Sequence, residues 1–582
     1  MREGVLHQVD EGRLDGRIGE KPLGLYPRIG LIALGAALYV ASFPMAGVYG
    51  LAWFALVPLF IASRDLTPGQ GFRHWFVFSF LANIFGFYWM APITAPGFLL
   101  SAVLMALYSG LGGVVLALVR RNVPRVPYWI VAALAWGATE YVKCLGFYAF
   151  PWLALGYSQA RNLLAVQTAS LFGVYGVSAV VIAFNALMAE AVNWLRRRSW
   201  RRALLPWGAA ALGLAAAVHL GGLAALGEPT YPERPVRAAI LQGGIPQDLK
   251  WAPYFITSGE TYRIYEHQVE RAVERAGSDY LDLVIWPESS ANCYLERTPM
   301  WSTLVQGMVN RSGCRHLVGT QALDYEGEGG AGRHFNAGVL LEPGNPKALE
   351  RYYKIHLVPF SETIPFGRDS ALLKDLLARA SNFNIGWRMP LFEVTPGRGP
   401  APLPVPDASV ADDDPTTFSL AERPELTAEL LPVPPLAPGP VLARFGLLIC
   451  FESIYPEMGL DYTRRGADFL VVITNDAWFR QSAAPYQHAE VSILRAVESR
   501  VPVLRAANAG VSLWVDPWGR VSGETLLDTE DVVLVKIPRA EGPTAYMLWG
   551  DALPWAELGA FILLALYAAV ESYRRRGRGR RP

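Results

Sequence analysis

Long stretches without a charged side chain constrain the fold of this chain more than any other feature. Asp, Glu, Lys and Arg are absent from residues 29–63, 75–119 and 162–189. A helix needs about 20 apolar residues to cross a membrane. The first two stretches are each long enough for two spans, so a break is expected near Pro44 or Gly47 and another at Pro92–Pro96.

Further spans fit three other apolar segments: Tyr128–Tyr148, Leu164–Ala189 and Ala203–Leu226. The sequence therefore predicts a membrane α-helical bundle of seven spans in residues 29–227. An eighth span is predicted at 546–573, where Trp555–Val570 is apolar except for Glu557. One carboxylate and one amine, Glu140 and Lys143, lie about one turn apart inside the fifth span. A role in a lipid path and a simple ion pair explain them equally well.

Positive charge predicts the orientation of these spans, because Lys and Arg of short loops stay on the cytoplasmic side. Basic residues cluster at Arg64–Arg73, Arg120–Arg125, Arg196–Arg202 and Arg574–Arg581. With eight spans, these clusters share one face with the polar N-terminal segment 1–28 and the basic tail 574–582. The large segment 228–545 then lies on the opposite face. The net charge of +1 argues against a nucleic-acid partner.

Short β-rich runs alternate with charged helical segments after residue 236. The expected strands are Ala238–Gln242, Leu283–Trp286, His316–Gly319, Asn336–Leu341, Phe445–Ile449, Phe469–Thr474, Val503–Ala506 and Ser512–Asp516. Gly259–Ala276 and Tyr486–Ser499 are expected to be helices. This alternation predicts an α/β domain with helices outside the sheets. Residues 396–440 are rich in proline and acidic side chains, which predicts an inserted loop that buries no core.

The four cysteines do not have the spacing of a metal site. Cys144 lies in a predicted span, and Cys293, Cys314 and Cys450 lie in the α/β domain. No CxxC or Cys/His metal motif occurs, so neither a metal nor another cofactor is expected. Cys293 and Cys314 could pair in an oxidising compartment, and the sequence leaves that open.

Cys450 ends an apolar run that starts at Phe445 and is typical of a buried strand. A cysteine attacks as the thiolate and therefore needs a nearby base or cation. Glu288 follows another apolar run and a proline, which makes it a candidate general base. Lys354, among aromatic and apolar neighbours, could stabilise the oxyanion of a tetrahedral intermediate. Together, these three residues predict acyl transfer through a thioester.

The segments around these residues, and several others, resemble one known family in their order along the chain. They are Trp286-Pro287-Glu288-Ser289, Tyr353-Lys354, Leu448-Ile449-Cys450-Phe451-Glu452, Gln242-Gly243-Gly244-Ile245-Pro246-Gln247, Thr474-Asn475-Asp476-Ala477-Trp478-Phe479, Gln487-His488 and Phe150-Pro151-Trp152. The chain is similar to the apolipoprotein N-acyltransferases, which join a membrane bundle to a domain of the carbon–nitrogen hydrolase (nitrilase) superfamily. The resemblance implies an αββα sandwich that faces the periplasm of a bacterial inner membrane.

The resemblance also implies a reaction and roles for particular residues. The cysteine would take an acyl chain from a phospholipid, typically phosphatidylethanolamine. It would then pass the chain to the α-amine of a diacylglyceryl cysteine in an apolipoprotein. Glu288 would be the general base, Lys354 the oxyanion stabiliser and Cys450 the nucleophile. The remaining matched positions would support the site or bind substrate: Glu362, Glu452, Trp251, Trp478 and Asn475.

One residue departs from the family pattern next to the nucleophile. Phe451 stands where the family commonly has tyrosine, so a hydroxyl is missing there. Two alternatives remain for the chain as a whole. A membrane-tethered amidase or nitrilase would use water as the acceptor, and a membrane scaffold would have no activity.

Overall fold

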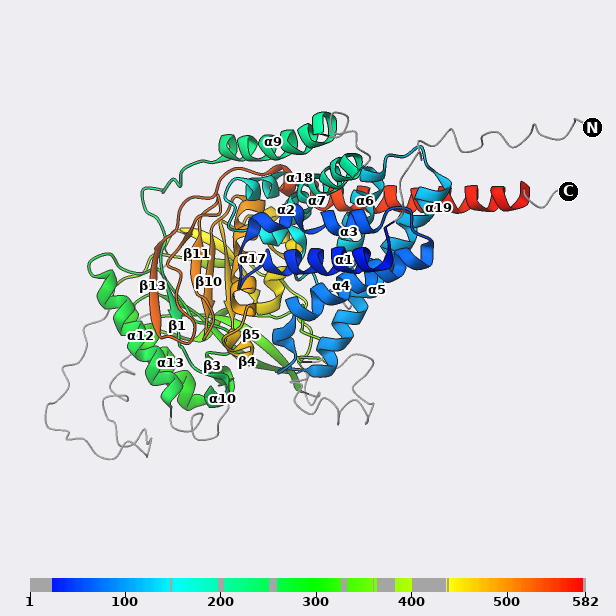
Figure 1. Ribbon diagram of the computed structural model, residues 1–582. Coiled ribbons are helices and arrows are strands. Elements are labelled where there is room, and N and C mark those ends of the chain that lie inside the picture. Colours follow the sequence, from blue (N-terminus) through cyan, green and yellow to red (C-terminus); the bar gives the residue numbers. More distant parts are fainter. Residues whose placement is uncertain are drawn as a thin grey trace, which may run out of the picture.

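The protein is described here from a computed structural model. It describes residues 23–146, 149–196, 204–250, 259–325, 332–359, 361–363, 383–399, 436 and 439–578. A bundle of helices and an α/β domain lie side by side (Figure 1). Trp251, most of the proline-rich segment 396–440 and part of the basic segment 196–202 fall outside the described residues.

The helical part follows the expected order of apolar segments. Its main elements are α1 (Leu25–Ala41), η1 (Tyr49–Leu51), α2 (Ala52–Ala55), α3 (Val57–Ala62), α4 (Pro68–Gly86), η2 (Tyr88–Met90), α5 (Ala95–Asn122), α6 (Tyr128–Val142), η3 (Leu155–Gln159), η4 (Ala165–Thr168), α7 (Ala169–Arg196), η5 (Leu204–Gly208), α9 (Ala209–Ala225), α18 (Ala545–Trp549) and α19 (Ala552–Arg578). The chain leaves helical structure at Ser42–Val48, which contains Pro44 and Gly47, and again before Ala95. Both breaks lie where the sequence predicted them.

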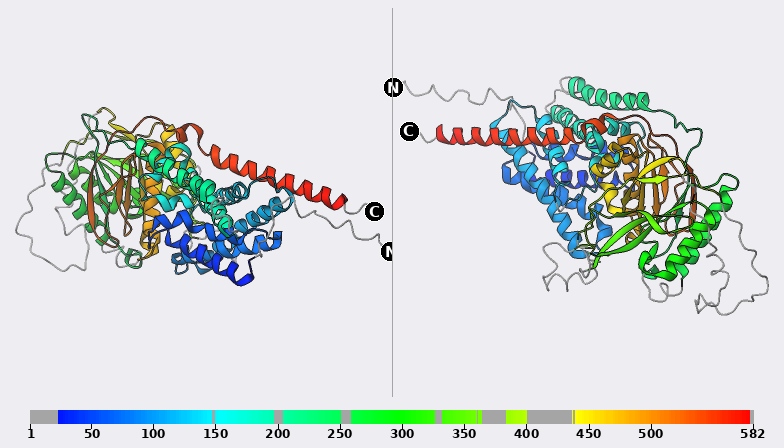
Figure 2. Two further views of the ribbon diagram at one scale, coloured as in Figure 1. Left: turned by 45° about the horizontal axis from the view of Figure 1, so that its top comes forward. Right: turned by 180° about the vertical axis from the view of Figure 1, so that it is seen from behind.

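Four described helices are long and apolar enough to cross a membrane: Ala95–Asn122, Ala165–Leu195, Pro206–Ala225 and Ala552–Arg576. Two shorter apolar helices, Leu25–Ala41 and Tyr49–Ala62, pack beside them. In Figures 1 and 2, α19 runs along the bundle and its end projects away from the α/β domain. The helical part is therefore a bundle with several apolar helices.

Helices α4 and α5 approach closely because glycines meet at their crossing. A Cβ atom added at Gly71 would lie 2.3 Å from the carbonyl oxygen of Gly113, so only glycine fits there. Small residues at helix crossings allow this close packing in membranes. The N-terminus of α4 is fixed by a capping box in which Thr67 and Gln70 bond each other's backbone.

Among the described residues, Glu140 and Lys143 form no ion pair within 4 Å, although their charges attract each other. Glu140 Oε1 accepts a hydrogen bond of 2.6 Å from the Leu155 backbone amide. Lys143 Nζ lies 5.5 Å from the centre of the Trp136 ring. Glu140 therefore anchors the segment after α6, a use that the sequence did not indicate.

The α/β domain contains two mixed sheets. The first has the order β13-β1-β2-β4-β5-β6, with β3 beside β4, and the second has the order β12-β11-β10-β9-β8-β7. The strands are β1 (Arg237–Gln242), β2 (Leu283–Ile285), β3 (Ala291–Tyr294), β4 (Arg315–Tyr325), β5 (Gly332–Glu342), β6 (Asn345–Tyr353), β7 (Phe392–Val394), β8 (Ala443–Ile449), β9 (Phe469–Thr474), β10 (Val503–Ala507), β11 (Leu513–Val515), β12 (Val521–Ser522) and β13 (Asp531–Lys536).

The two sheets pack face to face, and helices cover the outside of each. Ile240 and Ile285 of the first sheet share one apolar core with Leu447 and Ile473 of the second. The helices are α10 (Gln247–Lys250), α12 (Glu260–Ala276), α13 (Pro299–Ser312), α16 (Pro456–Arg464) and α17 (Ala484–Ser499). On the outer face of the first sheet, Val284 packs with residues of α12 and α13. These layers form the nitrilase-type sandwich.

The eight expected strands are all present, but others were not predicted from the sequence. The missed strands are β3, β6, β7, β12 and β13, and the missed helices are α10, α13 and α16. Strand β6 was missed because Asn345–Tyr353 contains charged residues and is mostly exposed on one side. Helix α17 is buried because it lies between the second sheet and the bundle, where it contacts α7.

All four cysteines have free thiols. The thiol of Cys314 is buried and lies 3.5 Å from Ser312 Oγ, whereas the thiol of Cys293 lies 3.3 Å from the Tyr262 hydroxyl. The possible Cys293–Cys314 disulfide is therefore not formed.

Candidate active site

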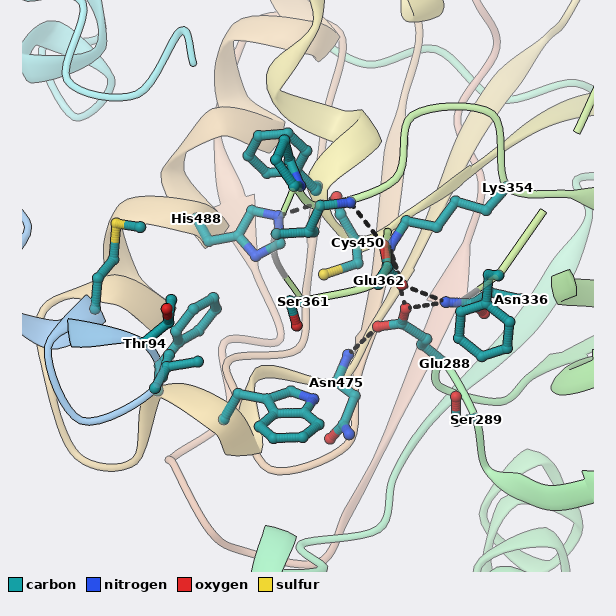
Figure 3. Close-up of a pocket in the computed structure, with 18 of the residues that line it drawn as sticks. Thr94, Glu288, Ser289, Asn336, Lys354, Ser361, Glu362, Cys450, Asn475 and His488 are labelled. Atoms are coloured by element: carbon teal, nitrogen blue, oxygen red, sulfur yellow. Dashed lines mark hydrogen bonds and ion pairs between the residues drawn. The ribbon is translucent and has the colours of Figure 1, made fainter. Parts of the chain in front are cut away.

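Cys450 stands at a sharp turn that follows β8. Its φ of 55° is in the left-handed region, which an L-residue occupies at a cost of about 1–2 kcal/mol. A 3-10 helix, η8 (Cys450–Ile454), starts directly there. The parallel neighbour β9 fixes the end of β8 through pairing up to Ile449 and Ile473. The turn therefore lifts the thiol out of the sheet and into the cavity (Figure 3).

Glu452 holds this turn against the segment that carries Lys354. One carboxylate oxygen accepts a hydrogen bond of 2.7 Å from the Ile449 amide. The other accepts bonds from the Tyr352 hydroxyl at 2.7 Å and the Ile355 amide at 2.6 Å. Burial raises the pKa of Glu452 to about 7. The side chain is fully buried, so its place is structural and lies behind the cavity.

Glu288 comes from the first sheet, three residues after the end of β2. Its Oε1 accepts a hydrogen bond of 2.7 Å from Asn336 Nδ2, and its Oε2 accepts one of 2.8 Å from the Asn475 amide. These bonds fix both oxygens, and Glu288 lines the same cavity as Cys450. Lys250 Nζ donates to the Glu288 carbonyl oxygen at 3.2 Å, and burial lowers the pKa of Lys250 to about 7.

Lys354 follows β6 and lies between two carboxylates. Its Nζ is 3.4 Å from Glu288 Oε1 and 2.9 Å from a Glu362 oxygen. Asn336 Nδ2 donates to both carboxylates, with a distance of 3.0 Å to Glu362. The dashed lines of Figure 3 trace this chain of contacts. Glu288, Lys354 and Glu362 therefore form one connected group beside the thiol.

The charges of this group determine the resting state of the thiol. Burial raises the pKa of Cys450, and the Glu288 carboxylate raises it further, whereas Lys354 only partly opposes this. Burial alone would lower the pKa of Lys354, but the Glu362 and Glu288 carboxylates outweigh it and raise that pKa. These shifts favour a protonated thiol and a lysine cation, with the Glu288 side chain in the same cavity as a candidate acceptor of the thiol proton.

A second polar network lies behind Cys450. Asp476 Oδ1 lies 2.9 Å from His488 Nδ1, and Asp476 Oδ2 accepts a bond of 2.7 Å from Arg505. His488 Nε2 is 3.1 Å from the Cys450 carbonyl oxygen. Burial would raise the pKa of Asp476, but Arg505 and His488 lower it to about 2. Burial and the Arg505 charge lower the pKa of His488.

From the sequence, Asp476 and His488 were identified only as members of family motifs. Arg505 was not identified as a residue of the site. A signal was available, because Arg505 is a charge inside the otherwise apolar strand β10. The ligand atoms of Cys450, Asp476 and His488 lie within 4.8 Å of one another, a spacing that could hold a metal ion. The Arg505 cation occupies the same network, and like charges disfavour a metal there.

The remaining expected residues fall around one cavity of about 140 Å³. Asn475 and the half-exposed Trp478 line it, and so does Phe451. Phe451 stacks on Phe150 of the bundle, with ring centres 5.8 Å apart. The Phe451 ring thus joins the α/β domain to the bundle through an aromatic contact. Trp251 lies outside the described residues.

Both parts of the molecule form this cavity. The bundle contributes Trp89, Met90, Ile93 and Thr94 from the segment between α4 and α5. A thiol, a carboxyl group and a lysine ammonium therefore meet apolar side chains from the helical bundle. This arrangement suits acyl transfer from a substrate with an apolar chain.

Comparisons with known proteins agree with this geometry. The family model of the apolipoprotein N-acyltransferase N-terminal domain matches residues 35–187, and that of the carbon-nitrogen hydrolases matches residues 238–544. The apolipoprotein N-acyltransferase of Geobacter metallireducens is 31% identical over 92% of this chain and 94% of its own length. That of Methylococcus capsulatus is 32% identical over 74% of this chain and 71% of its own.

Among solved structures, a variant of the amidase from Nesterenkonia sp. AN1 aligns with 55% of this chain and 97% of its own, at 16% identity and a TM-score of 0.33. The two family models together match residues 35–187 of the bundle and nearly all of the α/β domain. The chain therefore belongs to the apolipoprotein N-acyltransferase family, whose catalytic domain is of the carbon–nitrogen hydrolase type.

Proposed function

We propose that this enzyme transfers an acyl chain from a phospholipid to the N-terminal amine of a diacylglyceryl apolipoprotein, through a thioester on Cys450. One observation supports this most directly: Cys450, Glu288 and Lys354 line a cavity whose other walls include apolar side chains of the bundle. A soluble amide would need no such wall. Phosphatidylethanolamine is the proposed donor, because the family resemblance points to it.

In the first half-reaction, Glu288 takes the thiol proton and the Cys450 sulfur attacks the ester carbonyl carbon of the phospholipid. Lys354 stabilises the oxyanion, since its ammonium stays charged between Glu288 and Glu362. The carbon–oxygen bond of the ester then breaks. The departing oxygen receives the proton from Glu288, and a lysophospholipid leaves.

In the second half-reaction, the lipoprotein amine attacks the thioester carbonyl carbon. The carbon–sulfur bond breaks, Glu288 accepts the amine proton and returns it to the thiolate, and the amide product leaves. Glu362 and Asn336 keep Lys354 and Glu288 in place in both halves. We assign Trp478, Asn475 and Trp251 to substrate binding and Glu452 to support of the Cys450 turn.

We further propose that the chain crosses the bacterial inner membrane eight times. Residues 29–227 would form seven spans and 546–573 the eighth, with segment 1–28 and tail 574–582 in the cytoplasm. Residues 228–545 would then be the periplasmic catalytic domain. The positions of Lys and Arg support this orientation. Both substrates are lipids, so a domain at the outer leaflet would meet them directly.

A product analysis tests the reaction. The purified enzyme in lipid nanodiscs receives phosphatidylethanolamine labelled in its acyl chains, together with a synthetic diacylglyceryl lipopeptide. We expect label in the amide-linked chain of the peptide and a matching amount of lysophospholipid. Label found only as free fatty acid would identify a hydrolase that uses water, and no turnover at all would favour the scaffold.

A further inference from the structure

A second and larger cavity lies on the membrane side of the active site. It has a volume of about 610 Å³ and runs between α1 and α4. We call it the α1–α4 groove, and its walls include Ala33, Ala37 and Ala41 of α1 with Leu81 and Phe85 of α4. Alanines on one face of α1 leave the space that larger side chains would fill.

The lining of the α1–α4 groove is apolar except at one end. Among its lining residues, only Tyr88 and Gln487 carry a polar side-chain group. Ala37 and Phe85 are exposed at the bundle surface, Phe85 by 61%. The groove is therefore open where lipid would surround the bundle. Because surrounding lipid tails are as apolar as this surface, van der Waals packing would hold a hydrocarbon chain in the groove.

A thin partition separates the groove from the active site. Within η2, Tyr88 lines the groove, whereas Trp89 lines the active-site cavity. Gln487 Oε1 accepts hydrogen bonds from the indoles of Trp89, at 3.3 Å, and Trp152, at 2.8 Å. Gln487 Nε2 donates to the Pro44 carbonyl oxygen at 2.9 Å. The two cavities therefore share a wall of three side chains.

The active-site cavity is smaller than the α1–α4 groove, and this difference determines how much of a two-chain lipid each can hold. A cavity of about 150 Å³ holds one benzene molecule. The cavity at Cys450, about 140 Å³, thus encloses only a short part of one acyl chain. The α1–α4 groove has about four times that volume.

We propose that the α1–α4 groove binds the second acyl chain of the phospholipid donor, the chain that is not transferred. The reacting chain would enter the active-site cavity, and the lipid would straddle η2 with one chain on each side. This inference rests on the proposed function. The expected occupant of the groove is a lipid chain, because the groove has an apolar lining, is open at the bundle surface and lies next to the active-site cavity.

A pair of substitutions on α1 tests the proposal. Ala37→Phe fills the groove, and Leu34→Phe is the matched control, because Leu34 is on the same helix, is 51% exposed and does not line the groove. Each full-length variant is assayed in nanodiscs with two donors: diacyl phosphatidylethanolamine, and a single-chain p-nitrophenyl acyl ester. The readout is the rate of thioester formation at Cys450 as a function of donor concentration.

For Ala37→Phe we expect a rise in KM for the diacyl donor, since the added ring takes the space that the second chain would occupy. Its rate with the single-chain ester should equal wild type, which also shows that the variant is folded. Leu34→Phe should equal wild type with both donors.

Equal KM values for Ala37→Phe and wild type with the diacyl donor would overturn the groove assignment. An equal loss with both donors would overturn it too, because the groove would then matter for folding or for the transferred chain. If wild type formed no thioester from any phospholipid, the proposed function itself would fail. A second variant, Ala33→Phe, places the same block one turn away and should give the same pattern of losses.

Discussion

At the residue scale, the partly buried Cys450 has a thiol whose pKa is raised, although the proposed reaction needs its thiolate. Burial and the Glu288 charge raise the pKa of this thiol, and Lys354 does not compensate. Two carboxylates already hold Lys354, at 2.9 and 3.4 Å. In the proposed mechanism, proton transfer to Glu288 during the reaction would therefore activate the thiol, because no standing ion pair holds it as the thiolate.

The raised pKa of the Cys450 thiol predicts how its reactivity depends on pH. The pKa of Cys450 lies above its ordinary value, so the thiolate fraction should rise with pH throughout the neutral range. We expect the rate of iodoacetamide alkylation at Cys450, measured by peptide mass spectrometry, to increase about tenfold per pH unit between pH 6 and 9. A plateau near pH 7 would show a stable thiolate and contradict this account.

Glu288 provides a second prediction at the same scale. Glu288→Gln keeps the size of the side chain but removes the base, so thioester formation should slow by about 10²–10⁴-fold. Single-turnover kinetics with labelled phospholipid measure this step. Glu296→Gln is the control, because Glu296 forms an exposed ion pair with Arg351. Similar rates for Glu288→Gln and the control would remove Glu288 from the role of base.

At the scale of elements, the ends of strands and the turns after them position the residues of the site. These strand ends could be predicted from the sequence. Apolar runs that stop at Glu288 and Cys450 correspond to β2 and β8, and their carboxyl ends meet at one cavity. The breaks near Pro44 and before Ala95 were also predictable, because proline interrupts a helix.

Other features depend on tertiary contacts and could not be predicted. Strand β6 has a charged, partly exposed sequence and pairs only because β5 lies beside it. The network of Asp476, His488 and Arg505 joins the 3-10 helix η9 (Asp476–Phe479), α17 and β10, which are separate in the sequence. The bonds of Glu452 to Ile355 and Tyr352 likewise span about a hundred residues, too far for a local pattern.

The Asp476 network predicts a pH dependence of stability. The pKa of Asp476 is lowered to about 2 in the folded protein. Its contribution, about 2 kcal/mol, is therefore present above pH ~4 and lost as the pH falls toward 2. We expect Asp476→Asn to lower the free energy of unfolding by that amount at pH 7 and by less at pH 3. Asp248→Asn, at an 86% exposed side chain, is the control. If Asp476→Asn lowered the free energy of unfolding equally at pH 7 and pH 3, the Asp476 carboxylate would not be the source of the pH dependence.

The crossing of α4 and α5 gives another prediction at this scale. Gly71→Ala puts a Cβ against the Gly113 carbonyl, and such overpacking costs about 1–3 kcal/mol. Gly69 is in the same helix and has no atom within 4 Å of an added Cβ. Gly69→Ala should therefore leave the Tm in detergent unchanged or raise it slightly. Equal Tm values for the two variants would mean that the helices can separate at no cost.

At the scale of the whole molecule, the bundle does more than attach the catalytic domain to a membrane. Trp89, Met90 and Phe150 of the bundle line the cavity at Cys450. Hydrogen bonds across the junction, such as that between Trp152 and Gln487, tie the two parts together. Under the proposed function, an acyl chain against the bundle would thus reach a thiol held by the α/β domain. This shared cavity explains why one chain carries both parts.

The central claim is that Cys450 carries the acyl chain between two lipid substrates. The most direct measurement is the mass of the Cys450 peptide after the enzyme in nanodiscs is incubated with a phospholipid of defined chain length. We expect an increase equal to one acyl group, lost on addition of a diacylglyceryl lipopeptide and absent from Cys450→Ser. Cys314→Ser should still acquire it. An unmodified Cys450 in enzyme that nevertheless acylates the lipopeptide would contradict the account.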